Sequence, residues 1–264
     1  MKGMFQRKYL GIPYALYLLV FVVLPLIVIV TYALTDAEGN PGIGNFLNFF
    51  RDPNTLGTLV YSLVIASVTT MVCLLIAYPT AYFLAMSNIR SKGAIIMLMI
   101  MPMWINFTLR ITALKELLTM IEGNLALHPF LNSVVGMTYD FLPFMILPIY
   151  NQIERIDKSL LEAASDLGAD NTQAFLRVLL PLSMPGVISG ISMVFLPAMT
   201  NYVVLDMLYN STYIMGSLIG SYFSAYDWHG GSTISLILLA MICIFTLLAG
   251  DDENEGTVRG GSVL

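Results

Sequence analysis

Residues 162–181 read EAASDLGADNTQAFLRVLLP, the longest polar and helix-compatible interval in a chain that is otherwise mostly apolar. The stretch is typical of two short helices separated by a break. Gly168 suits the C-terminal end of the first helix, where a residue in the left-handed conformation is favoured. Asp170, Asn171 or Thr172 can cap the N-terminus of the second helix. The apolar segments on either side can be counted outward from this break.

Small residues mark one face of the first of these two helices. Ala163, Ala164 and Gly168 lie close together on it and leave a smooth surface that another protein can approach closely. An amphipathic hairpin lying on a membrane surface agrees equally well with the same residues. Local sequence chemistry alone leaves both interpretations open.

The composition indicates a polytopic membrane protein. The chain has 264 residues, of which 57% are hydrophobic and 11% are charged, against about 25% charged in an average soluble domain. The formal net charge of −5 argues against nucleic-acid binding, which needs clustered Lys and Arg. Cys73 and Cys243 lie inside apolar runs, and His128 and His229 are isolated, so that a metal site or another catalytic centre is not expected.

The apolar runs predict an all-α membrane protein with six transmembrane helices. The first run is too long for the apolar core of a signal peptide and is expected to be a retained span. The six expected spans are 10–34, 58–86, 94–118, 133–150, 185–207 and 232–249. They make up one permease-like membrane domain, 1–249, with a long polar loop at 151–184. An acidic, Gly-rich tail, 250–264, is expected to be disordered.

The distribution of Lys and Arg predicts the orientation. Short loops on the cytoplasmic side of a membrane carry an excess of these residues. With the N-terminus inside, nine of them fall on the inner side and at most three on the outer side. Both termini and the loop 151–184 are therefore expected to be cytoplasmic. The nine inner residues are Lys2, Arg7, Lys8, Arg90, Lys92, Arg155, Lys158, Arg177 and Arg259.

Proline interrupts most of the expected spans. A proline in a membrane helix frees a backbone carbonyl, which a neighbour or cavity water must satisfy. Ordinary kinking explains any single one, whereas together they suit a bundle that bends around a pathway. The residues are Pro25, Pro79, Pro102, Pro143, Pro148 and Pro197.

The spacing of the polar stretch resembles the signature of permease subunits in bacterial ABC importers. That signature is Glu-Ala-Ala, three residues, Gly, nine residues, an aliphatic residue, any residue, and Leu-Pro, and Val178 stands where the family more often has Ile. In this family the loop forms a coupling helix that sits in a groove of the cytoplasmic ATPase. The resemblance implies coupling roles for Glu162, Ala163, Ala164, Asp166, Gly168, Ala169, Asp170 and Pro181.

The resemblance also implies partners and a mechanism. A second homologous permease, an ATPase dimer and an extracytoplasmic solute-binding protein would join this chain, surrounded by membrane lipid. ATP and Mg would be bound by the ATPase subunits and no cofactor by this chain, which contains no GxxxxGK[ST] loop. Transport would proceed by alternating access driven by the ATPases.

Three segments resemble B-type permeases of spermidine/putrescine importers within this family. They begin at Met101, Phe141 and Leu180 and read MPMWINFTLRITALK, FLPFMILPIYNQIERIDKSLLEAASDLGA and LPLSMPGVISG, the last continuing to FLPAMTNYVVLDML at 195–208. The resemblance implies polyamines as the solute and a polyamine-binding protein as the outer partner. A different solute, such as a metal ion or a sugar, remains an alternative. An intramembrane enzyme is a remote one, because no paired Ser/His, HExxH or GxGD arrangement occurs.

A pathway for polycations needs carboxylates and aromatic faces. Asp206, expected at the end of the fifth span, is the first candidate, with Tyr202 one helical turn before it; a solvated helix end explains Asp206 equally well. Asp140 is the second candidate, although pairing with Arg110 is the favoured explanation for it.

Other polar and aromatic residues lie near the expected ends of the spans. Trp104 and Asn106 could offer a ring and an amide to the pathway, or Trp104 could be an interfacial residue. Asp227 and Trp228 could help to dock the binding protein, or only shape the turn before the last span. Tyr209, Tyr213, Tyr222 and Tyr226 are typical of an interfacial aromatic belt.

Overall fold

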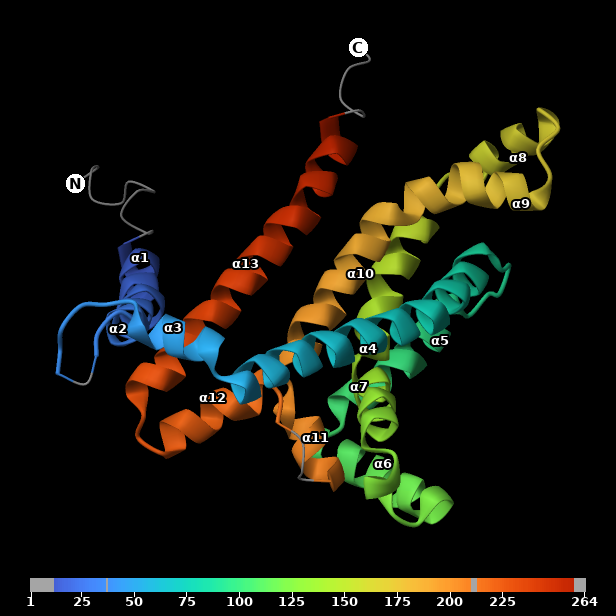
Figure 1. The fold of residues 1–264 in the computed structure, drawn as a ribbon. Helices are drawn as coiled ribbons and strands as arrows, with labels where there is room; N and C mark the ends of the chain where they lie inside the picture. The colour runs from blue at the N-terminus through green and yellow to red at the C-terminus, as the bar shows by residue number, and fades with distance from the viewer. Residues whose placement is uncertain (1–11, 37, 210–212, 259–264) are drawn as a thin grey trace, which may run out of the picture. The chain divides into compact units, whose positions relative to one another are not determined.

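The computed structural model describes residues 12–36, 38–209 and 213–258, and within them it is built from helices (Figure 1). An isolated bridge between Thr35 and Pro41 is the sole extended pairing among these residues. The expected all-α fold is therefore confirmed. The chain divides into two compact units, residues 1–58 with 217–241, and residues 59–216 with 242–264.

The first unit begins with a helix that changes its hydrogen-bonding pattern in the middle. Helix α1 spans Ile12–Leu18, a π-helical turn covers Leu19–Val23, and α2 spans Leu24–Ala33. Pro25 is the second residue of α2, and a proline has no N–H to donate to the carbonyl four residues earlier and clashes with it through its ring. The π turn accommodates the missing hydrogen bond at Pro25 without interrupting the helix.

The rest of the first unit lies at one end of this span. It comprises α3 (Gly44–Arg51), the start of α4 (Pro53–Met86), most of α12 (Met215–Ser224) and the N-terminal part of α13 (Trp228–Val258). The Asn45 side-chain amide donates to the carbonyl of Thr35 at 2.8 Å. The ring Nδ1–H of His229 donates to the carbonyl of Tyr32 at 3.0 Å. Both bonds satisfy backbone groups close to the end of α2 and fix α3 and α13 beside it.

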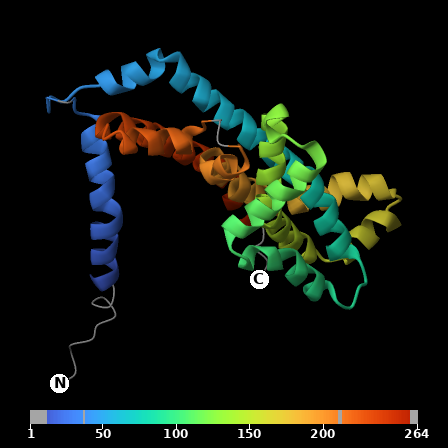
Figure 2. The ribbon, with the colours of Figure 1, turned by 90° about the horizontal axis from the view of Figure 1, so that it is seen from below.

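The second unit contains the remaining helices. Its elements are most of α4, α5 (Lys92–Ile100), the 3₁₀ turn Met101–Trp104, α6 (Phe107–Glu122), the 3₁₀ turn Leu125–Leu127, α7 (Pro129–Glu154), α8 (Ser159–Asp166), α9 (Asn171–Ala174), the π turn Phe175–Leu179, α10 (Leu180–Thr200) and α11 (Tyr202–Tyr209). Helices α7 and α10 lie side by side in both views, with α8 and α9 at their shared end (Figures 1 and 2).

Glycines allow α7 and α10 to pack closely. A Cβ at Gly186 would lie 2.6 Å from Cβ of Gln152, and a Cβ at Gly190 would lie 2.7 Å from Sδ of Met145. Both distances are well below the van der Waals contact distances of carbon–carbon and carbon–sulfur pairs, so that only glycine fits at these positions without a shift. Small residues at such crossings bring helix backbones together, which is the usual basis of helix association in membranes.

Five described helical segments are long and apolar enough to cross a membrane, and a sixth span results if the bent pair α5–α6 is counted as one. The sequence predicted one third span at 94–118 with Pro102 inside it, and the structure bends there by 96° between Trp104 and Phe107. The other segments are Ile12–Ala33, Pro53–Met86, Pro129–Glu154, Asn171–Thr200 and Trp228–Leu247.

Two further boundaries differ from the expectation. The fifth span does not reach residue 207, because the helix stops at Thr200 and Asn201 separates it from α11. Helix α13 continues to Val258, whereas a disordered tail was expected from residue 250. The expected inner residues Lys2, Arg7, Lys8 and Arg259 lie outside the described residues.

Candidate coupling loop and transport pathway

The break in the polar stretch is made by a single left-handed glycine. Helix α8 ends at Asp166, and Gly168 has φ +86°, a conformation that side chains with a Cβ rarely adopt. The Gly168 N–H donates to the carbonyl of Ser165 at 2.9 Å, and the Ala169 N–H donates to that of Ala164 at 3.0 Å. These bonds satisfy carbonyls at the C-terminus of α8. The predicted role of Gly168 in the backbone is confirmed.

Asp170 starts the next helix. Its Oδ1 accepts from the backbone N–H of Gln173 at 2.7 Å, so that Asp170 is the capping residue among the three that were considered. The second helix is not short, contrary to the prediction. It continues through a π turn, Phe175–Leu179, into α10. Leu180 separates this turn from Pro181, as Leu24 separates the π turn of the first span from Pro25.

The hairpin presents polar and apolar groups outward. Glu162, Ala163, Asp166 and Gly168 are exposed, and Leu167 is 89% exposed. The hairpin tip therefore exposes one large apolar side chain among polar and small residues.

A carboxylate lies just before the first helix of the hairpin. The carboxylate of Asp157 accepts from the backbone N–H of Ser159, the first residue of α8, at 3.0 Å, and this bond lowers the pKa of Asp157 from its usual value. A negative charge close to the N-terminus of a helix is favourable to the helix dipole.

The far side of the hairpin is attached to the membrane helices. The ring of Phe175 packs edge-on against Tyr78 and Tyr82 of α4, with centroid distances of 5.9 and 5.8 Å. The hydroxyls of Tyr78 and Ser183 are hydrogen bonded at 2.9 Å, which joins α4 to α10. The C-terminal half of the hairpin is therefore joined to α4 and α10 through packed side chains.

Asp140 occupies the position of a structural ion-pair partner. Its Oδ1 accepts from Nη2 of Arg110 at 2.7 Å, and the two side chains are 7% and 9% exposed. This pairing was the favoured expectation and is confirmed. With its charge compensated by Arg110, Asp140 is not available as an open substrate-binding carboxylate in this conformation.

The other pathway candidates are divided between two sites. Asn106 caps α6, because its Oδ1 accepts from the backbone N–H of Thr108 at 2.9 Å, while Trp104 is 76% exposed at the bend before it. Asp206 and Tyr202 are both exposed on α11, four residues apart on one face. The structure therefore brings Asp206 together with Tyr202 on a helix separate from the fifth span, and Trp104 with Asn106 at the bend in the third.

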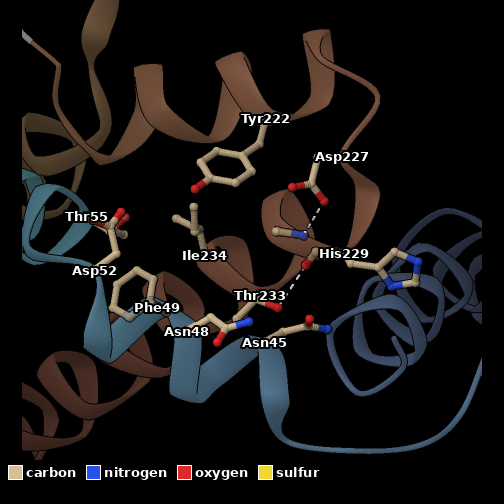
Figure 3. Close-up of a pocket in the computed structure, with 11 residues that line it drawn as sticks. Asn45, Asn48, Phe49, Asp52, Thr55, Tyr222, Asp227, His229, Thr233 and Ile234 are labelled. Atoms are coloured by element: carbon tan, nitrogen blue, oxygen red, sulfur yellow. Dashed lines mark hydrogen bonds between the residues drawn. The ribbon is translucent and has the colours of Figure 1, made fainter. Parts of the chain in front are cut away.

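A polar pocket in the first unit was not predicted. It has a volume of about 220 Å³, and its lining residues come from α3, α4, α12 and α13 and from the turns before α4 and α13 (Figure 3). Segments 45–55 and 222–234 contribute to it, and no spacing within either segment signals that they meet. The lining residues are Asn45, Asn48, Phe49, Asp52, Thr55, Tyr222, Asp227, His229, Gly230, Thr233 and Ile234.

Known proteins with similar sequences agree with this architecture. The family described as the binding-protein-dependent transport system inner membrane component matches residues 74–250. The spermidine/putrescine transport system permease protein PotB of Haemophilus influenzae is 33% identical, covering 91% of this chain and 91% of that protein. PotB of Escherichia coli K12 is 35% identical, covering 88% of this chain and 92% of that protein.

A solved structure shows the same fold at low sequence identity. A chain of the bacterial alginate ABC transporter, crystallised in complex with its alginate pentasaccharide-bound periplasmic protein, superposes with a TM-score of 0.71 at 14% identity. The match covers 92% of this chain and 91% of the other. The apolar helices, the matched family and the PotB relatives lead to one conclusion: the chain belongs to the inner-membrane permease components of binding-protein-dependent ABC transport systems and is a multi-pass protein of the bacterial inner membrane.

Proposed function

We propose that this chain is the permease subunit of an ATP-driven importer for polyamines of the spermidine/putrescine class. The observation that carries the proposal is the likeness to PotB proteins, at 33–35% identity across 88–91% of the chain. The family match over residues 74–250 includes the coupling hairpin and the candidate pathway residues, which supports one transport role for both.

The hairpin is proposed to receive the movement of the ATPase subunits. Its exposed tip, with Leu167 and Asp166, would sit in a groove of the ATPase, and Glu162 would anchor the base of α8 by a hydrogen bond or an ion pair. The packing of Phe175 against Tyr78 and Tyr82 of α4 supports this role. A docked hairpin can move α4 and α10 only if it is firmly packed against them. ATP and Mg belong to the ATPase partners in this scheme.

The pathway is proposed to use the exposed face of α11. The carboxylate of Asp206 can pair with an ammonium group, and the ring of Tyr202 can add cation–π attraction. Trp104 offers a second exposed ring at the bend of the third span. A second homologous permease would complete the pathway, a polyamine-binding protein would deliver the substrate outside, and both termini would be cytoplasmic.

Uptake of radiolabelled spermidine, putrescine and an unrelated sugar tests the proposal in cells with and without this chain. The partner subunits must be present in both strains, and other polyamine importers must be deleted. Loss of polyamine uptake alone is the expected result. Unchanged polyamine uptake would contradict the proposed substrate and leave a permease for another solute.

A further inference from the structure

The pocket of the first unit, here named the α3–α12 pocket, has the chemistry of a cation site. Two of its lining residues, Asp52 and Asp227, carry carboxylates, and none is a Lys or an Arg. Figure 3 shows the two carboxylates on opposite sides of the pocket, with the ring of Tyr222 between them. With two Asp side chains and no Lys or Arg, the lining has a negative character that attracts cations.

Each carboxylate accepts a hydrogen bond from residues two or three positions further along the chain. The N–H of Gly230 donates to Oδ1 of Asp227 at 2.8 Å, and no hydrogen bond to Oδ2 is found within the described part of the chain. The Thr55 hydroxyl donates to Asp52 at 2.5 Å and, with the N–H of Asn54, lowers the pKa of Asp52. Both groups are therefore fixed, and Asp52 is charged at neutral pH.

Gly230 opens the space between the carboxylate and the ring. A Cβ at this position would lie 2.4 Å from Cδ1 of Tyr222 and 2.8 Å from Oδ2 of Asp227. Any larger residue would push the ring or the carboxylate away. The close approach of the backbone therefore sets one wall of the pocket.

The lining fits an organic ammonium group better than a metal ion. Nowhere among the described residues do three His, Cys, Asp or Glu side chains gather as a metal site requires. Instead, the rings of Phe49 and Tyr222 accompany the carboxylates, a combination that attracts alkylammonium groups through charge and through the ring faces. The side-chain amide of Asn48 adds a further polar group.

The position of the pocket in the chain places it at one end of the spans. Its residues belong to the connection between the first and second spans and to the one that leads into the last span. Consecutive spans alternate in direction, so that in a six-span protein these two connections emerge on the same side. The positive-inside distribution of Lys and Arg assigns this side to the outside.

We propose that the α3–α12 pocket binds a terminal ammonium group of a linear polyamine at the outer surface, separately from Asp206. The site would hold an amine released by the binding protein before it enters the pathway. This inference rests on the proposed function for the identity of the ligand, while binding can be measured without transport.

Calorimetric titration of the purified importer, without the binding protein and in an Asp206→Asn background, tests the site. The probes are spermidine, putrescine and MgCl₂. Asp227→Asn keeps an oxygen for the Gly230 N–H but removes the charge, and we expect it to weaken spermidine binding by about tenfold or more. Tyr222→Leu removes the ring without touching a helix cap and is expected to weaken binding as well. MgCl₂ at the same concentrations is expected to compete only weakly.

Glu38→Gln is the matched control, since it removes an exposed carboxylate from the same connection outside the pocket and is expected to leave binding unchanged. Wild-type affinity in both pocket variants would overturn the site. So would a loss of affinity for the binding protein with unchanged amine binding, which would make Asp227 a docking residue. No spermidine binding combined with normal polyamine uptake would overturn the site but keep the proposed function. Spermidine binding at the pocket without polyamine uptake would support the site and overturn the proposed function.

Discussion

Arg110 on α6 and Asp140 on α7 form a buried ion pair with 2.7 Å between Nη2 and Oδ1. Only Nη2 of the Arg110 guanidinium takes part in the pair. Its Nε and Nη1 are buried without a hydrogen-bond partner in the described structure. Breaking such a pair leaves an uncompensated charge, which is more costly than replacing both partners by apolar groups. The pair therefore ties the bent third span to the fourth, and its two members depend on each other.

Asp140→Leu alone is expected to destabilise the permease strongly, by about 3–5 kcal/mol, because it leaves the Arg110 charge buried and unpaired. The double variant Arg110→Met/Asp140→Leu is expected to recover most of the loss. Thermal unfolding of the purified importer in detergent measures both. Equal destabilisation in the single and double variants would show that the pair does not act as a unit.

Substitutions at Gly168 measure the cost of a strained backbone conformation without any steric clash of the new side chain. Nothing lies within 4 Å of a Cβ built there, so that the strain of Gly168→Ala comes from φ +86° alone and is expected to cost about 1–2 kcal/mol locally. The hairpin would shift, and ATP-dependent transport would fall. Gly168→Asn is expected to retain more transport, because Asn tolerates the left-handed conformation better. Gly93→Ala, also in open space but with ordinary φ, is the control.

The close packing of α7 and α10 predicts a different effect at Gly186. A Cβ there would meet Gln152 at 2.6 Å and the Pro148 carbonyl at 2.8 Å, so that Gly186→Ala is expected to destabilise the protein by about 1–3 kcal/mol through overpacking. Gly220→Ala in α12 meets nothing within 4 Å and is expected to be neutral or slightly stabilising. Equal melting temperatures for the two variants would contradict the packing argument.

Asp206→Asn is expected to raise the polyamine concentration for half-maximal uptake without reducing assembly of the importer. The side chain is exposed on α11 and supports no packing, so that its loss removes charge rather than structure. Concentration-dependent spermidine uptake and co-purification of the subunits measure the two properties. An unchanged uptake curve would make Asp206 a solvated helix end.

Local chemistry explains why part of the molecule could be predicted from the sequence. A glycine followed by a capping Asp fixes the break at Gly168 regardless of what surrounds it, and an intramembrane Asp140 requires a partner such as Arg110. The resemblance to the permease family rests on the same stretch, Glu162 to Pro181, but as a matched pattern and not as a consequence of its local chemistry. These features depend on short sequence distances or on strong charge compensation.

Other features depend on context that the sequence does not display. Proline residues did not distinguish a broken span from a continuous one, because Pro143 and Pro148 lie inside α7 whereas Pro102 lies in a 3₁₀ turn at the bend. The length of the fifth span was misjudged because α11 continues its apolar character beyond Asn201. The α3–α12 pocket joins segments far apart in the chain, and only the fold reveals it.

The most direct test of the central claim is ATP-dependent spermidine accumulation in proteoliposomes that contain the complete importer and its binding protein. Wild-type importer is expected to accumulate spermidine but not the control sugar. Glu162→Lys in the coupling hairpin is expected to abolish accumulation and weaken the association of the ATPase subunits, while Glu38→Lys, a control on a different connection, is expected to preserve both. Spermidine accumulation by the Glu162→Lys importer at the wild-type rate, or no accumulation by the wild type, would contradict the account.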